Sequence, residues 1–203
     1  MTIFDYKKDL KTLYFPSKKD FSIVDVPEMN FLMVDGHGDP NTSLDFQAAV
    51  NALYSLAYGI KFAIKSRGVE YSVPPLEGLW WVDDMSQFTR ISKDEWDWTV
   101  MIMQPDAVTA EDFERARHEV GMKKDLPALL KVRLAPYAEG LAVQIMYFGS
   151  YAEESLTITR MHAFIHEHGF ALNGKHHEIY LGDPRRTAPE KLRTVIRQPI
   201  RKI

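Results

Sequence analysis

Two short stretches in the first half of the 203-residue chain are each similar to a stretch in the second half, and the order is the same in both halves. Residues 80–84 (WWVDD) resemble 179–183 (IYLGD), and residues 99–105 (TVMIMQP) resemble 194–199 (TVIRQP). Each pair of stretches follows a strand, a strand-breaking turn and a helix. The sequence therefore predicts a duplicated unit of one strand, one helix and a two-strand hairpin.

The apolar pattern predicts where these elements lie. An arm at 7–19 and an edge strand at 20–26 precede the first unit. No linker rich in Ser, Gly or Pro separates the halves, so we expect one domain, 1–203, made of pseudo-repeats at about 20–108 and 128–203. Strands are expected at 30–35, 76–82, 95–103, 128–134, 141–148, 176–181 and 192–198, and helices at about 43–66, from Thr109 to about 121, and at about 153–168.

The expected fold class is α+β, with two β-α-β-β units side by side in one curved antiparallel sheet. The helices should cover one face of this sheet. The other, concave face would then be open and would form a central cleft for a small molecule.

Composition and charge exclude several kinds of partner. A net charge of -3 gives no drive toward nucleic acid or acidic membranes. No apolar run approaches the roughly 20 residues that span a bilayer, and the charged N-terminus does not resemble a signal peptide. The chain has no cysteine, which suits a reducing compartment. We therefore expect a cytoplasmic protein that contacts neither nucleic acid nor membrane directly, and no feature specifies an oligomeric state.

The strand at 176–181 carries the strongest candidate for chemistry. Side chains alternate along a strand, so His176, Glu178 and Tyr180 should share one face. Ile179 and Leu181 should then pack on the helices, leaving Glu178 and Tyr180 to face the cleft. In the first half, the corresponding row is Glu77, Leu79 and Trp81, with Trp80 on the opposite face.

A carboxylate among aromatic rings has two uses. Ionised, it attracts a cationic ligand that the rings also attract. With its pKa raised by burial, it can act as a general acid or base. The alternative is a surface glutamate paired with Arg185, Arg186 or Arg193.

Metal and cofactor signatures are incomplete. His162 and His166 stand four residues apart, but the glutamate that a zinc-peptidase helix carries after its first histidine is missing, so solvated histidines at a helix end explain them better. Gly36-His37-Gly38 lacks the remaining residues of a phosphate-binding loop and is interpreted as a turn. We expect no metal and no cofactor.

The second half resembles the GyrI-like small-molecule-binding family. The resemblance lies in 144–151 (QIMYFGSY), in the helix end 164–170 (FIHEHGF), in 176–186 (HHEIYLGDPRR) and in the tail 192–200, and it extends to most of 30–203. It implies a duplicated fold of the SHS2 type with a central cleft. In the related drug-sensing domains, a strand glutamate surrounded by aromatic residues receives cations, and Glu178 matches that glutamate.

The resemblance implies three possible functions. Some stand-alone members hydrolyse the strained ring of cyclopropane-bearing genotoxins, with Glu178 and Tyr180 as the catalytic residues here. Others bind drugs without chemistry, and others bind DNA gyrase, which is the weakest of the three. For either of the first two, Leu79, Trp81, Trp98, Tyr147 and His176 are the candidate ligand-binding residues.

Overall fold

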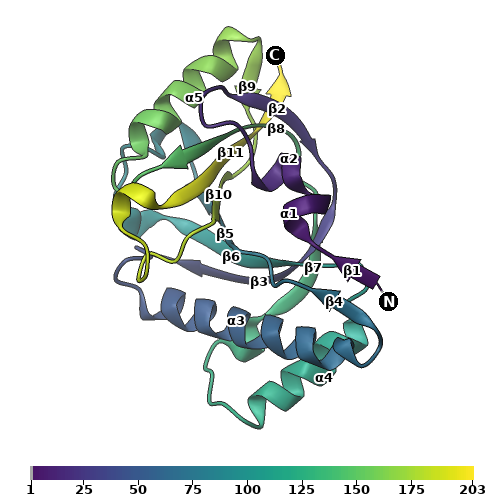
Figure 1. Ribbon diagram of the computed structural model, residues 1–203. Helices are drawn as coiled ribbons and strands as arrows, with labels where there is room; N and C mark the ends of the chain where they lie inside the picture. Colours follow the sequence, from purple (N-terminus) through teal and green to yellow (C-terminus); the bar gives the residue numbers. More distant parts are fainter. Residues whose placement is uncertain (1) are drawn as a thin grey trace.

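A curved antiparallel sheet dominates the computed structural model, which describes residues 2–203 (Figure 1). Helices α1 and α2 lie in the hollow of this sheet, whereas α3, α4 and α5 lie on its outer side. The strands are β1 (Thr2–Phe4), β2 (Ser22–Val26), β3 (Met29–His37), β4 (Val69–Tyr71), β5 (Leu76–Trp81), β6 (Asp97–Gln104), β7 (Arg133–Tyr137), β8 (Gly140–Phe148), β9 (Phe170–Leu172), β10 (His176–Tyr180) and β11 (Arg193–Lys202). The helices are α1 (Tyr6–Asp9), α2 (Lys11–Tyr14), α3 (Leu44–Lys65), α4 (Ala110–Gly121) and α5 (Ser155–Glu167).

The order of elements is the same in both halves. The first half runs β3-α3-β4-β5-β6, and the second runs β8-α5-β9-β10-β11. The sheet order is β2-β8-β11-β10-β5-β6-β3-β7, with β9 paired to β11, so β10 and β5 join the halves at the centre. The predicted α+β class with one large antiparallel sheet is therefore confirmed. We infer that the two five-element blocks are the predicted repeats.

The strand that precedes each five-element block pairs with the first strand of the other block. β2 pairs with β8, and β7 pairs with β3, both in antiparallel register. The predicted strand at 128–134 is wrong in its bounds, because residues 129–131 form a 3-10 turn. This turn buries Ala128, Leu129 and Val132 against the core under α3, a spacing that suits a helical turn better than alternating strand geometry.

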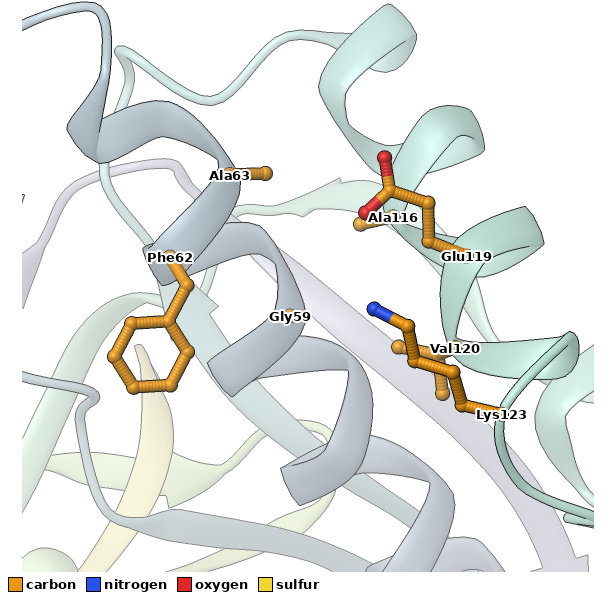
Figure 2. A pocket seen from close by; sticks show the side chains of 7 residues that line it. All are labelled: Gly59, Phe62, Ala63, Ala116, Glu119, Val120 and Lys123. Carbon is orange, nitrogen blue, oxygen red and sulfur yellow. The ribbon is translucent and has the colours of Figure 1, made fainter.

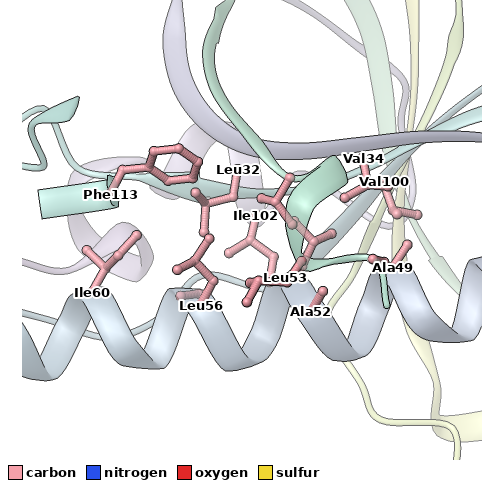
Figure 3. Close-up of a cluster of buried hydrophobic side chains, with 14 of the residues drawn as sticks. Leu32, Val34, Ala49, Ala52, Leu53, Leu56, Ile60, Val100, Ile102 and Phe113 are labelled. Atoms are coloured by element: carbon pink, nitrogen blue, oxygen red, sulfur yellow. The ribbon is translucent and has the colours of Figure 1, made fainter. Parts of the chain in front are cut away.

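The outer face of the first half is covered by α3. Ser43 caps this helix by accepting a hydrogen bond from the amide of Phe46, 3.2 Å away. Its buried residues recur at helical spacing and face β3 and β6, where Leu32 and Ile102 belong to the same cluster (Figure 3). The buried residues of α3 are Ala49, Ala52, Leu53, Leu56, Ala57, Ile60 and Ile64.

The inner face of the sheet is covered by the N-terminal arm, which corrects the expectation that this face would be open. Tyr6, Leu13 and Tyr14 from α1 and α2 pack on the inward side chains of the strands. Those inward side chains include Phe31, Met33, Leu79, Met101, Met103, Met146, Ile179 and Val195.

A buried ionic network fixes the inner face beneath the arm. His177 Nε2 lies 3.0 Å from Glu77 Oε2, and His177 Nδ1 lies 2.9 Å from Glu139 Oε1. Arg197 Nη1 donates to Glu139 Oε2 over 2.9 Å. All four side chains are at most 1% exposed. Two cations therefore balance two carboxylates, which is the condition under which buried charges persist.

The arm joins this network through three hydrogen bonds. The Tyr14 hydroxyl donates to Glu77 Oε1 over 2.5 Å. Arg197 Nη2 donates to the carbonyl of Leu13 over 2.7 Å, and Gln144 Nε2 donates to the carbonyl of Thr12 over 2.7 Å. The network therefore ties the chain start to both halves of the sheet.

The charges in the network shift its pKa values in opposite directions. Burial would lower the pKa of His177, but Glu139 and Glu77 outweigh burial and raise this pKa to about 9. Burial would raise the pKa of Glu139, but His177 and Arg197 lower it to about 2. His177 is therefore a cation at neutral pH, bonded to a carboxylate through each ring nitrogen.

We expect the free energy of unfolding to fall as pH rises through the pKa of His177. Its folded pKa of about 9 lies above the ordinary 6.5, so its stabilisation is complete below pH 6.5 and lost as pH passes 9. Urea unfolding across this pH range measures the effect. His177→Gln should lose that pH dependence and destabilise the protein by roughly 3–5 kcal/mol, since two carboxylates lose their cation. His118→Gln, at an exposed site, is the control.

Removing the Tyr14 hydroxyl should weaken the arm. Tyr14→Phe deletes a buried hydrogen bond to a carboxylate, which typically contributes roughly 1.5–3 kcal/mol. Limited proteolysis of the arm should accelerate together with the loss of stability. Tyr6→Phe is the matched control, because the Tyr6 hydroxyl forms no hydrogen bond to any side chain among residues 2–203. Equal behaviour of the two variants would contradict a role for the Tyr14 bond.

Candidate functional site

The candidate site lies on the outer face of β10, at the junction of the two halves. His176, Glu178 and Tyr180 share this face, as the strand alternation predicted, and Glu178 is only 5% exposed. Their neighbours across the β5 pairing are Trp80, Gly78 and Leu76. The alternative, a surface glutamate paired with Arg185, Arg186 or Arg193, is wrong for Glu178. Glu178 is buried, and Arg185 is bonded to Asp183.

Glu178 is held by polar neighbours on its own strand. The Tyr180 hydroxyl donates to Glu178 Oε2 over 2.8 Å, and Trp80 Nε1 donates to the Tyr180 oxygen over 3.1 Å. His176 Nε2 lies 3.3 Å from Glu178 Oε1. The chain Trp80–Tyr180–Glu178 therefore crosses from one half of the sheet to the other.

Aromatic rings surround this polar chain. The Tyr151 ring meets the Tyr180 ring edge-on with centroids 5.4 Å apart, and Phe88 lies 5.3 Å from the His176 ring. Trp96 stacks on Phe88 at 4.6 Å. Phe88 and Trp96 belong to the irregular segment between β5 and β6, and Tyr151 belongs to the turn before α5. Both halves thus contribute rings.

A second carboxyl group reaches the site from the start of α5. Glu154 occupies the N-cap position of this helix and is 6% exposed, but its side chain makes no capping bond. Burial together with the charge of Glu178 raises the pKa of Glu154 to about 10. Burial would raise the pKa of Glu178 too, but contacts with His176 and Tyr180 outweigh it and lower this pKa.

Several buried polar atoms near the site lack a hydrogen-bond partner among the described residues. Such atoms are uncommon in folded proteins and often mark positions where water or a ligand binds. His162 is half-buried, so the expectation that it would be solvated is wrong. Burial and nearby histidines lower the pKa of His162 to about 4, so this side chain is neutral at pH 7. The unpartnered atoms include both ring nitrogens of His176, Glu154 Oε2, His162 Nε2, Thr194 Oγ1 and Gln198 Oε1.

The structure does not bring every candidate residue to this site. Leu79 and Trp81 project from the inner face, because antiparallel register places Leu79 opposite His177 and Trp80 opposite His176. Lys175 Nζ already lies 3.3 Å from the centroid of the Trp81 ring. The assignment of Trp80 to the face opposite Glu178 is therefore wrong, and Trp80 takes the place expected for Trp81.

Trp98 lies away from Glu178, whereas Tyr147 lies on the outer face, two strands from Tyr180 across Thr194. Trp98 is 1% exposed in the core under α3, where its ring packs edge-on against Phe46. The ring also lies so close to the backbone at position 36 that only glycine fits there. Tyr147 lines a separate surface hollow of about 420 Å³, whose rim carries three cations that would repel a cationic ligand. Those cations are Lys18, Lys19 and Arg160.

A second surface hollow, of about 300 Å³, lies between α3 and α4 (Figure 2). Phe62 and Gly59 line it from α3, Glu119 and Val120 line it from α4, and Lys123 lines it from the turn after α4. It lies on the outer helices and shares no residue with the site around Glu178.

Sequence reasoning missed Trp80, Tyr151 and Glu154. The sequence signal for Trp80 was Gly78, a glycine inside a strand. The structure shows why glycine stands there, because a Cβ atom at position 78 would lie 2.7 Å from the indole nitrogen of Trp80. The signal for Glu154 was a glutamate at a helix start, where Ser, Thr, Asp or Asn is the usual cap.

No helix within residues 2–203 is long and apolar enough to cross a membrane. No group of three or more His, Cys, Asp or Glu side chains there is arranged to hold a metal ion.

The chain belongs to the GyrI-like family, since the model of the GyrI-like small molecule binding domain matches residues 19–201. It is similar to an uncharacterized conserved protein from Listeria innocua, with 41% identity over 98% of this chain and 100% of that one and a TM-score of 0.90. A Listeria innocua protein described as a hydrolase is 40% identical over 98% and 100%, with a TM-score of 0.84. No match was found among curated proteins.

A more distant likeness concerns the fold alone. The C-terminal domain of EcmrR is 10% identical, with a TM-score of 0.57 over 94% of this chain and 99% of that domain. The family thus makes the protein a small-molecule-binding domain, and the junction at Glu178 is the part whose geometry suits that role.

Gly78→Ala should disturb the junction specifically. The added methyl group would meet the Trp80 indole at 2.7 Å, so the ring must shift away from the Tyr180 hydroxyl, at a cost of about 1–3 kcal/mol. Urea unfolding and the near-ultraviolet tryptophan signal should both change. Gly121→Ala is the control, since its methyl group would lie 3.4 Å from Leu129. An unchanged tryptophan signal in Gly78→Ala would contradict the close approach.

Proposed function

We propose that this protein binds planar, drug-like molecules at the Glu178 junction, in the cytoplasm, and hydrolyses cyclopropane-bearing genotoxins there, protecting the cell. The observation that carries the proposal is a buried carboxylate set among aromatic rings and unpartnered polar atoms. A site of this composition can recognise charge, a flat ring system and a hydrogen-bonding group together.

Ligand recognition would use the rings from both halves. Trp80, Tyr151 and Phe88 are the aromatic neighbours of the ligand, with Trp80 in the place expected for Trp81. Each ring face in contact with a cation contributes roughly 0.5–2 kcal/mol. The ionised Glu178 adds attraction in a site that excludes most water, where charge interactions are stronger than at the surface.

Entry of a ligand requires movement of the segments that cover the site. The Glu178 side chain is only 7% exposed, so a ring system cannot reach it while Phe88 and Tyr151 keep their places. Both rings are on irregular segments, between β5 and β6 and before α5. Such segments open at lower free energy than the strands beneath them.

The proposed reaction is addition of water to the strained ring. Glu178 accepts a proton from water, whose oxygen bonds to a ring carbon while a carbon–carbon bond of the cyclopropane breaks. The released electron pair moves to a conjugated carbonyl oxygen, to which the Tyr180 hydroxyl donates a hydrogen bond once Glu178 has gained its proton and no longer needs that hydroxyl. This oxygen takes up a proton from solvent and Glu178 releases one to solvent, so the reaction adds one water in all. Ring strain supplies part of the driving force, and the site supplies position and a base.

Similarity supports a hydrolase without naming its substrate. The Listeria innocua protein described as a hydrolase matches 98% of this chain at 40% identity. A non-catalytic drug-sequestering protein is the second candidate, because the same buried anion and rings would hold a cation without any chemistry.

Glu178→Gln should separate the two candidates. The variant keeps the shape of the side chain but cannot accept a proton, so turnover of a spirocyclopropane alkylator should fall about 10²–10⁴-fold while binding of a neutral planar analogue persists. Mass spectrometry for added water measures turnover, and tryptophan quenching measures binding. Glu153→Gln, at the exposed neighbour of Glu154, is the control.

Three results would decide the matter. Unchanged turnover in Glu178→Gln would remove Glu178 from the mechanism. Absence of turnover in the wild-type protein, together with quenching by planar cations, would favour sequestration. In that case Glu178→Gln should weaken the binding of cations far more than that of neutral analogues.

A further inference from the structure

The hollow of about 420 Å³ beside β8 has a rim of cations. Two of them, Lys18 and Lys19, precede β2, and the third, Arg160, lies on α5. Ile145 and Met146, both buried, give the hollow an apolar lining. Within residues 2–203, no aspartate or glutamate lines it. The hollow therefore combines positive charge with apolar surface, a composition that suits an organic anion.

No acid neutralises these three cations. None of them takes part in an ion pair among residues 2–203, although the chain carries 28 acidic side chains against 25 of Lys and Arg. The hollow between α3 and α4 differs, because its lining includes the acid Glu119 as well as the cation Lys123 (Figure 2). The positive charge beside β8 is therefore available to a ligand.

The two lysines belong to a segment that is fixed to β8. The amide of Met146 donates to the carbonyl of Ser17 over 2.9 Å, and the amide of Lys19 donates to the Ser17 hydroxyl oxygen over 3.0 Å. Lys18 Nζ lies 5.6 Å from the centroid of the Phe148 ring, which attracts it. Because these contacts restrict where the two ammonium groups can lie, less conformational entropy is lost when an anion binds.

The third cation comes from α5 together with a hydroxyl group. Thr157 and Arg160 are three residues apart, so they lie on one face of the helix, and both line the hollow. The guanidinium carbon of Arg160 lies 6.0 Å from the centroid of the Phe21 ring, a contact that holds the long side chain near the sheet edge. An anion in the hollow would therefore meet cations from two separate elements.

We propose that this hollow is a second binding site and that its ligand is a small organic anion with a planar ring, such as an aryl carboxylate. The anionic group would lie among Lys18, Lys19 and Arg160. The ring would contact the apolar lining and Phe148, whose side chain is 48% exposed. A volume of about 420 Å³ is within the range of small-molecule pockets, and a chain with a net charge of -3 has no overall attraction for nucleic acid.

The hollow and the Glu178 junction differ in charge and in place. Glu178 lies on β10, whereas the hollow is lined by β8, and β11 separates these strands in the sheet. Because neighbouring strands are about 4.8 Å apart, β8 and β10 are roughly 10 Å apart. The anion site therefore goes beyond the hydrolysis proposed above and does not depend on it.

Isothermal titration calorimetry with the full-length protein tests the charge preference. The probes are 2-naphthoate and 2-naphthylmethanol, which share a ring system and differ in charge. At low salt, 2-naphthoate should bind at one site, about tenfold or more tighter than the neutral alcohol, and added salt should reduce this difference.

Arg160→Gln and Lys19→Gln test the location. Each removes one charge at an exposed position, so each should fold like the wild type and weaken 2-naphthoate binding about 2–5-fold, and the double variant about 4–25-fold. Neither should change the affinity for 2-naphthylmethanol. Lys123→Gln, in the hollow between α3 and α4, is the matched control and should bind both probes like the wild type.

Three results would overturn the anion site. The first is equal affinity for the two probes, or no saturable binding of 2-naphthoate. The second is a loss in Lys123→Gln as large as in Arg160→Gln, since the effect would then follow net charge and not location. The third is 2-naphthoate binding that weakens in Glu178→Gln and persists in Arg160→Gln, which would place the anion at the junction. None of these measurements needs turnover, so failure of the proposed hydrolysis is a separate outcome.

Discussion

The pairing of β10 with β5 is the interaction on which the other features of the molecule depend. Within residues 2–203 it is the only strand pairing that joins the two four-strand blocks of the large sheet, and its register sets what lies on each face. On the inner face, this register brings His177 to Glu77. On the outer face, it brings Trp80 to Tyr180 and so to Glu178. Because a shift of one residue would exchange the faces, a single register specifies both polar clusters.

The two clusters treat buried charge in opposite ways. On the inner face every charge of the network has a bonded partner of opposite sign, and the arm covers the network. None of these charged groups is left unpaired to bind a ligand, so this cluster has a structural role. On the outer face the charge of Glu178 raises the pKa of a second buried acid, Glu154, and neighbouring polar atoms lack partners within the described chain. A site of that kind is less favourable for the protein alone than with a ligand or water in place. The contrast is the physical reason to locate function on the outer face.

Much of this arrangement could be predicted from the sequence. Period-two alternation grouped His176, Glu178 and Tyr180 correctly, and the internal similarity of the halves indicated the repeated element order. The face itself was wrongly assigned, because apolar Ile179 was expected under the helices and packs under the N-terminal arm instead. The match of the repeats also aligned Trp81 with Tyr180, whereas antiparallel register decides which rings meet. Register, arm docking and the proximity of buried acids arise from tertiary packing, and local patterns carry little information about them.

The exchange of first strands between the halves has a consequence for how the gene can change. β2 completes the edge of the second half, and β7 completes the edge of the first. If the halves were separated, each would keep a strand that fits the other and expose the backbone donors and acceptors of β8 or β3. An ancestral single unit would have satisfied the same edges by pairing with a second copy of itself. If the halves arose by duplication, as we infer, fusion into one polypeptide made that pairing permanent, and the second half now supplies Glu178 while the first supplies the Trp80 indole.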